Sequence, residues 1–198
     1  IVGDPKQLPP TDFFQNRIAD DEFDDDLSDE SILDMALTVF HPPRELLWHY
    51  RSRHEDLIKF SNTKFYQNNL LVPVTADKSR KDRGISHNYI EDGFYSSSAG
   101  GGSGGINVNE AIAVVEAAIS FMKERPNESL GIATMNIKQK EFIQNEFDLR
   151  SSGDEAVANY LSRWEEDKEG LEEFFIKNLE NVQGDERDVI IVSTVYGR

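Results

Sequence analysis

The chain has 198 residues, no cysteine, and a formal net charge of −16 at pH 7. The absence of cysteine excludes disulfides and thiolate metal sites and fits a reducing compartment, so we expect a cytoplasmic protein. No apolar run reaches the roughly 20 residues of a membrane-spanning helix, and nothing at the start resembles a signal peptide, so we expect no membrane partner. The four histidines lack the spacing of metal ligands, so we expect no protein-bound metal.

The acidic charge is concentrated in two runs. Residues 20–30 and residues 154–173 each hold eight carboxylates, and the remaining 21 acidic residues balance the 21 lysines and arginines. Such runs are most often solvated surface. An acidic chain disfavours a surface dominated by nucleic-acid binding, but the neutral remainder leaves room for a local basic track.

The start of the chain predicts the end of a strand. Ile1 and Val2 are apolar, and a Gly-Asp-Pro turn follows. A strand beginning at the first residue suggests a piece of a longer protein. Ligands bind at the carboxyl ends of strands in open α/β sheets, which places Asp4 and Gln7 for chemistry. An ordinary proline-rich turn is the alternative.

Apolar spacing next predicts a helix over residues 28–39, a short strand over 46–48 and a helix over 54–65. Two arginines, Arg51 and Arg53, follow the short strand. A pair of guanidinium groups at a strand end suits an anion, because arginine stays charged and can clamp a phosphate with two hydrogen bonds. A pair of ordinary surface arginines is the alternative.

The second half begins with a Gly/Ser-rich segment, residues 96–105, which predicts a flexible linker and looks engineered. Periodicity then predicts a helix over 107–122, a strand over 130–134, a helix over 139–147 and an acidic helix or helix pair over 153–171. Alternating strands and helices favour an α/β fold with a parallel, doubly wound sheet.

The last segment joins a polar loop to an apolar run. Residues 189–195 are rich in β-branched side chains, which predicts a parallel strand buried on both faces. The loop before it contains Gln183, Gly184 and Glu186. Glycine allows close approach of the backbone, and the amide and carboxylate offer hydrogen bonds to a ribose or phosphate. An ordinary loop-to-strand junction remains open.

Three blocks resemble the motifs of superfamily 1 helicases, nucleic-acid translocases built from two RecA-like domains. Residues 178–195 resemble motif V, residues 3–10 resemble motif III, and Tyr50 to His54 resemble motif IV. The similarity is greatest to the 1B branch and, within it, to a bacterial subgroup of large helicases. The resemblance implies a RecA-like parallel sheet flanked by helices, the P-loop NTPase fold.

The resemblance also implies roles for individual residues. Three would be catalytic: Gln7, which contacts the γ-phosphate, Arg51, the arginine finger, and Glu186. The nucleotide-binding set would be Asp4, Gln7, Arg51, Gly184 and Glu186. Thr134 and Gln139 would lie near the nucleic-acid backbone.

The implied domain organisation is unequal. Residues 1–27 would be the motif III tail of a first RecA-like domain with an acidic connection, and residues 28–198 a second such domain truncated before motif VI. No Gly-x-x-x-x-Gly-Lys-Ser/Thr phosphate loop occurs in the sequence, and the family's magnesium-binding Asp-Glu pair would precede residue 1.

By resemblance, the intact parent would use ATP and Mg²⁺ to move along single-stranded nucleic acid, with DNA favoured over RNA and 5′-to-3′ movement expected. Its first RecA-like domain would be a partner of this chain, which alone would be inactive. Two alternatives stand: a nucleic-acid-dependent ATPase switch without unwinding, and an acidic protein-interaction domain.

Overall fold

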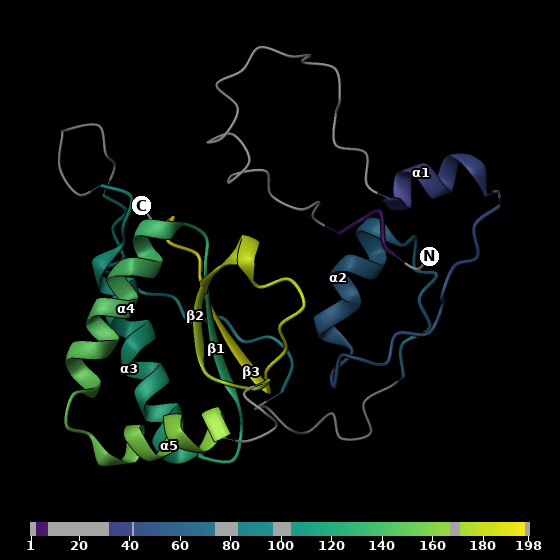
Figure 1. The fold of residues 1–198 in the computed structure, drawn as a ribbon. Coiled ribbons are helices and arrows are strands. Elements are labelled where there is room, and N and C mark those ends of the chain that lie inside the picture. The colour runs from purple at the N-terminus through teal and green to yellow at the C-terminus, as the bar shows by residue number, and fades with distance from the viewer. Residues whose placement is uncertain are drawn as a thin grey trace, which may run out of the picture. The chain divides into compact units, whose positions relative to one another are not determined.

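The computed structural model describes residues 3–7, 32–40, 42–73, 83–96, 104–166 and 171–196 (Figure 1). The chain divides into two compact units, Ile1–Asn88 and Tyr89–Arg198, which are described separately. The predicted domain boundary after residue 27 and most of the predicted linker lie outside the described residues.

The described residues of the first unit form two short helices, α1 (Ile32–Val39) and α2 (Asp56–Phe65), and neither contains a buried residue. Both helices were predicted, and α2 begins two residues later than expected. The predicted strand over 46–48 was wrong, because this segment makes only one isolated parallel bridge, between Trp48 and Leu71. Three apolar residues in a row are too weak a signal where no neighbouring strand offers a continuous ladder.

The described residues of the second unit form a three-stranded parallel sheet with the order β2-β1-β3. The strands are β1 (Leu130–Thr134), β2 (Phe175–Asn178) and β3 (Val189–Ser193). Thr134 at the end of β1 is level with Asn178 of β2 and Ser193 of β3. This sheet and its flanking helices confirm the predicted α/β class.

Helices α3 (Val108–Glu124), α4 (Ile137–Ser151) and α5 (Glu155–Glu166) lie on one side of the sheet (Figure 1). Their apolar faces meet the sheet in one core, because residues three and four apart share a helix face. The core includes Val115, Ala118, Met122, Ile132, Ile143, Phe147, Tyr160, Trp164 and Ile176. No helix in the described part of the chain is long and apolar enough to cross a membrane.

Two sequence predictions need correction here. Strand β2 was not predicted, and a short 3-10 helix, Leu179–Asn181, follows it. Strand β3 is parallel as expected, but it is not buried on both faces, because Ile190 and Val192 are 36% and 48% exposed. The reason is that β3 lies at the sheet edge and α3, α4 and α5 cover the opposite face.

Candidate nucleotide and nucleic-acid sites

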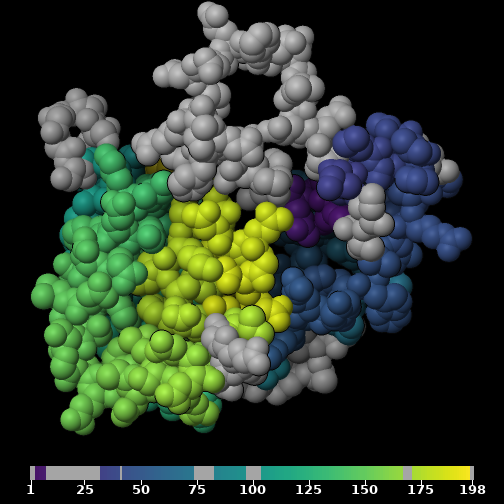
Figure 2. Space-filling model, viewed as in Figure 1, coloured from purple at the N-terminus to yellow at the C-terminus, as the bar shows by residue number. Residues whose placement is uncertain are grey.

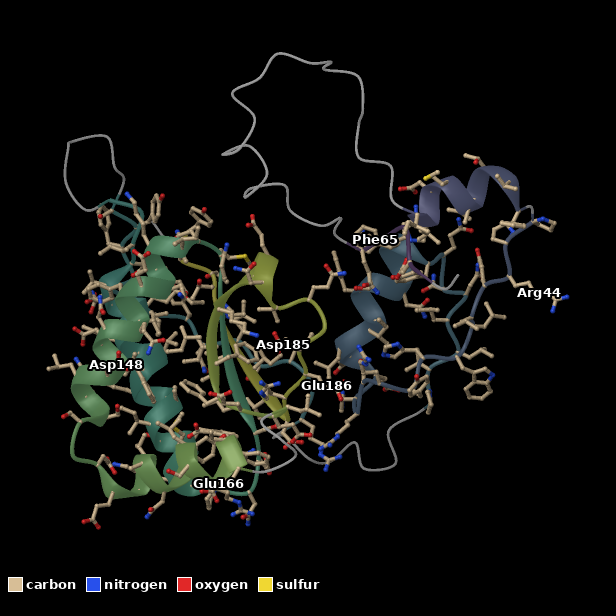
Figure 3. All side chains as sticks on the ribbon, in the orientation of Figure 1. Arg44, Phe65, Asp148, Glu166, Asp185 and Glu186 are labelled. Carbon is tan, nitrogen blue, oxygen red and sulfur yellow. The ribbon has the colours of Figure 1, made fainter. Side chains whose placement is uncertain are left out.

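The first candidate site is the loop of residues 183–188, which joins the 3-10 helix to β3. Gly184 has a φ of +92°, and a Cβ added there would meet nothing within 4 Å. The glycine is therefore favoured by backbone conformation and not by crowding. Both Gly184 and Glu186 are exposed, and Figure 3 shows Asp185 and Glu186 next to each other on this loop.

The shape of the 183–188 loop is fixed by Arg187, whose side chain is only 4% exposed. Its Nε and Nη2 donate to the backbone oxygen of Glu173 at 2.8 and 2.5 Å, and its Nη1 donates to that of Glu186 at 2.7 Å. The guanidinium carbon lies 4.8 Å from the centre of the Phe175 ring, a cation–π contact. Arg187 was not predicted to be a functional residue, although its position next to Glu186 in the motif was the available signal.

Phe175 connects this loop to the middle of the sheet. Lys177 Nζ lies 5.0 Å from the ring centre and 2.6 Å from Asp185 Oδ2. Beneath the ring, a Cβ added to Gly131 would approach Phe175 Cζ to 2.4 Å, closer than real contacts allow. Only glycine fits at that point of β1, where the Phe175 ring lies directly against the backbone.

Asp188 aligns the start of β3 with the start of β1. Its Oδ2 accepts hydrogen bonds from the Ser129 backbone N and Oγ at 2.9 and 3.2 Å, and its own N donates to Ser129 Oγ at 2.9 Å. Burial raises the pKa of the nearby Tyr160, whose hydroxyl donates to the Glu128 backbone oxygen. These bonds keep the amino ends of the two strands in register.

Thr134 and Gln139, the predicted nucleic-acid contacts, are both 0% exposed. Thr134 Oγ1 donates to the backbone oxygen of Asn136 at 2.9 Å. Gln139 Oε1 accepts from the Asn107 backbone N at 2.8 Å, and its Nε2 lies 3.1 Å from the Asn107 backbone oxygen and 3.2 Å from Ser193 Oγ. The structure thus brings both residues to the carboxyl end of the sheet but turns their side chains inward, and their contact with nucleic acid stays a prediction.

In the first unit, Asp4 organises the turn that carries Gln7. Asp4 Oδ2 accepts from the Tyr66 hydroxyl at 2.5 Å and from Gln7 Nε2 at 3.4 Å, and Asp4 Oδ1 accepts from the Lys6 backbone N at 3.0 Å. Burial raises the pKa of the Asp4 carboxyl, but these hydrogen bonds outweigh it and lower the pKa overall. The same bond to Asp4 raises the pKa of Tyr66 to about 12. The Asp4 carboxyl therefore remains charged at neutral pH. Gln7, to which it bonds, is exposed.

Arg51 and Arg53, also in the first unit, are both exposed. The turn before Arg53 is held by His49, whose Nε2 lies 2.7 Å from Ser52 Oγ and accepts from the Ser52 backbone N at 3.3 Å. Burial, followed by the charge of Arg51, lowers the pKa of His49. The lowered pKa favours the neutral form of His49, so His49 adds no positive charge to that of Arg51 and Arg53.

Within each unit, the exposed predicted residues have the chemistry to contact a phosphate. Exposed guanidinium groups suit phosphate oxygens, and the open backbone at Gly184 can approach a ligand closely. The predicted nucleotide residues are divided between the units, with Asp4, Gln7 and Arg51 in the first and Gly184 and Glu186 in the second. Among the described residues no group of three or more His, Asp or Glu side chains could hold a metal ion, so we derive no step through magnesium from this chain.

Comparisons with known proteins show which family the chain belongs to. Residues 28–198 match the family model described as an AAA domain. The chain is 33% identical over 210 residues to a protein of Mycoplasma genitalium named "Uncharacterized ATP-dependent helicase MG140", and 34% identical over 212 residues to the homolog of that helicase in Mycoplasma pneumoniae. Each alignment covers 100% of this chain but 18% of the relative. No solved structure matches. The chain belongs to the AAA domain family.

Proposed function

We propose that the chain is part of an ATP-dependent helicase that moves along single-stranded nucleic acid, with DNA favoured over RNA. The observation that carries the proposal is the 183–188 loop. Its motif residues Gly184 and Glu186 are exposed, while Arg187 beside them is buried and fixes the backbone. The similarity along the whole chain to proteins named ATP-dependent helicases supports the same activity.

In this proposal ATP, bound with Mg²⁺ in the intact protein, supplies the free energy of phosphoryl transfer. Arg51 stabilises the negative charge that develops on the γ-phosphoryl group, as arginine fingers do. Gln7 hydrogen-bonds to the γ-phosphate through its neutral amide, and Asp4 holds the turn that presents it. Glu186 and the backbone at Gly184 contact the nucleotide from the second unit. The magnesium ligands come from the first RecA-like domain, which is the structural partner of this chain.

Nucleic acid would bind at the carboxyl end of the sheet, where Thr134 ends β1 and Gln139 lies in the first turn of α4. Because both side chains are buried, they would stabilise the shape of this edge. The backbone around them would contact the nucleic acid. We place the intact protein in the cytoplasm.

The test is ATP hydrolysis by the full-length protein, with and without single-stranded DNA, and by this chain alone. We expect DNA to stimulate the full-length protein and this chain to be inactive. Arg51→Ala should lower the stimulated rate by about a thousandfold or more. Arg44 provides a matched control, because it is another exposed arginine of the first unit (Figure 3), and Arg44→Ala should leave the rate unchanged.

Three outcomes would count against the proposal: no hydrolysis by the full-length protein, hydrolysis by this chain alone, or equal effects of the two arginine substitutions. Separation of a duplex by the full-length protein distinguishes a helicase from an ATPase switch. Binding of single strands that weakens steeply with salt distinguishes both from an acidic protein-interaction domain.

A further inference from the structure

An aromatic pair, the exposed Tyr196 and the half-buried Tyr95, lies just beyond the end of β3. The ring centres of Tyr95 and Tyr196 are 5.2 Å apart, and the ring planes are tilted by 53°. Tyr196 is 63% exposed, although it follows directly on the fully buried Val195. The Tyr95 ring thus contacts the Tyr196 ring on one side, and most of Tyr196 remains open to solvent.

Backbone hydrogen bonds place this pair at the carboxyl end of the sheet. Met135 N, just after β1, donates to the Ser193 backbone oxygen at 3.3 Å. Asn136, the N-cap of α4, donates to the backbone oxygen of Gly105 at 3.0 Å, and Gly105 N donates to that of Ser96 at 2.5 Å. Tyr95 immediately precedes Ser96, so the ends of β1 and β3 and the aromatic pair share the edge at which α/β proteins bind ligands.

The backbone that presents Tyr196 is strained. Val195 has a φ of +66°, which is rare for a β-branched residue, and Tyr196 N donates to the Thr194 oxygen at 2.7 Å. This hydrogen bond closes a γ-turn, and γ-turns with positive φ are rare and strained. Strain of this kind persists where surrounding groups enforce it, and it is concentrated at functional sites.

Two buried or half-buried side chains enforce the turn. Glu110 Oε1 accepts hydrogen bonds from Val195 N at 3.1 Å and from Ser193 Oγ at 3.0 Å. Asn107, which is 2% exposed, donates from Nδ2 to the Val195 oxygen at 3.2 Å. The carboxylate of Glu110 is therefore directed into the protein, and its hydrogen bonds hold the turn that projects the Tyr196 ring.

The same edge also carries positive charge. Lys138 lies in the first turn of α4, and its Nζ donates to the Gly104 backbone oxygen at 2.8 Å. The amino end of this 15-residue helix adds the partial positive charge of its free N–H groups. A polyanion could be attracted here even though the chain as a whole is acidic.

We propose that Tyr196, backed by Tyr95, is a platform on which an unpaired base of single-stranded nucleic acid stacks. The inference rests on the proposed function, because it names the part of the nucleic acid that this edge would bind. Every base has an aromatic face, so stacking tolerates any sequence, as a translocase requires. Paired bases are already stacked within a duplex, so the platform would favour single strands.

The test uses the full-length protein and two fluorescent oligomers of equal length, oligothymidylate and the same backbone with abasic sites. Stacking on one aromatic residue contributes enough that Tyr196→Ala should weaken oligothymidylate binding by about 5- to 100-fold. Binding of the abasic oligomer and the salt dependence should stay the same, because the phosphate contacts remain. Tyr196→Phe keeps the ring and should bind like the unaltered protein.

Tyr89 gives a matched control, because it is 62% exposed in the same unit, and Tyr89→Ala should not change binding. The inference is overturned if Tyr196→Ala behaves like Tyr89→Ala, or if it weakens both oligomers equally. If the unaltered protein binds neither oligomer, the proposed function itself fails and the stacking inference fails with it. Circular dichroism of each variant would show that the fold is retained.

Discussion

Replacing Gln139 with alanine would show whether its side chain stabilises the fold or contacts nucleic acid. Its side chain is fully buried and bonds to the backbone N of Asn107 at 2.8 Å, to the Asn107 oxygen at 3.1 Å and to Ser193 Oγ at 3.2 Å. In Gln139→Ala the buried Asn107 amide loses its partner, which costs about 1–3 kcal/mol. The deleted atoms also leave a cavity, so the expected loss is about 2–4 kcal/mol of a total stability of about 5–15 kcal/mol.

The assay is urea denaturation followed by circular dichroism. Gln144 is the matched control on the same helix, because it makes one exposed hydrogen bond, from Nε2 to Asp148 Oδ1 at 3.0 Å. Gln144→Ala should cost no more than about 0.5 kcal/mol. If Gln139→Ala costs as little, the argument from buried hydrogen bonds is wrong. If it weakens nucleic-acid binding without any loss of stability, Gln139 acts as a direct ligand.

Three further predictions concern other parts of the chain. Gly131→Ala should destabilise the second unit by about 1–3 kcal/mol in urea denaturation, because the added Cβ would overlap the Phe175 ring. Adding Phe175→Leu to that variant should recover part of the lost stability, and no recovery would refute the overlap. Tyr66→Phe should raise the pKa of Asp4 towards 3.8, as followed by NMR titration, because it removes the hydrogen bond that lowers it, and an unchanged pKa would refute that cause. The lowered pKa of His49 means that the folded state favours the neutral imidazole. The contribution of His49 to the free energy of unfolding is therefore present above pH 6.5 and is lost as the pH falls through the folded-state pKa. His49→Gln should flatten this dependence in denaturation curves measured from pH 7 to about pH 5.

The elements that the sequence predicted well are those whose burial follows a simple period. Helix α3, predicted over residues 107–122, begins after its N-cap Asn107, which accepts a hydrogen bond from the Glu110 backbone N. Strand β1 has the predicted bounds, and all five of its residues are buried. Strand β2 was not predicted, because two of its four residues are the polar Lys177 and Asn178. Their strand partners are residues distant in the sequence and cannot be recognised from the local pattern.

The candidate sites were only partly predictable for a similar reason. The motifs pointed to the 183–188 loop, where the structure gives Gly184 a positive φ, and the roles of its residues stay a prediction. Burial of Thr134 and Gln139 could not be predicted, because the partners of Gln139 lie 32 and 54 residues away along the chain. A polar side chain at a strand end is consistent with solvent exposure or with an internal network, and only the fold distinguishes the two.

The residues that shape the 183–188 loop differ from those that the motif offers to a ligand. The last part of the chain, yellow in Figure 2, reaches the surface. Gly184 and Glu186 of the loop are exposed, whereas the side chain of Arg187 is buried against Phe175. The Phe175 ring in turn lies directly on Gly131 of β1. Because β1 ends at Thr134, the same strand supports the loop and forms the edge proposed for nucleic acid. A shift of β1 would therefore move the 183–188 loop and the strand edge at Thr134 together. Neither can move alone without breaking the close packing of Phe175 on Gly131 or the parallel pairing of β1.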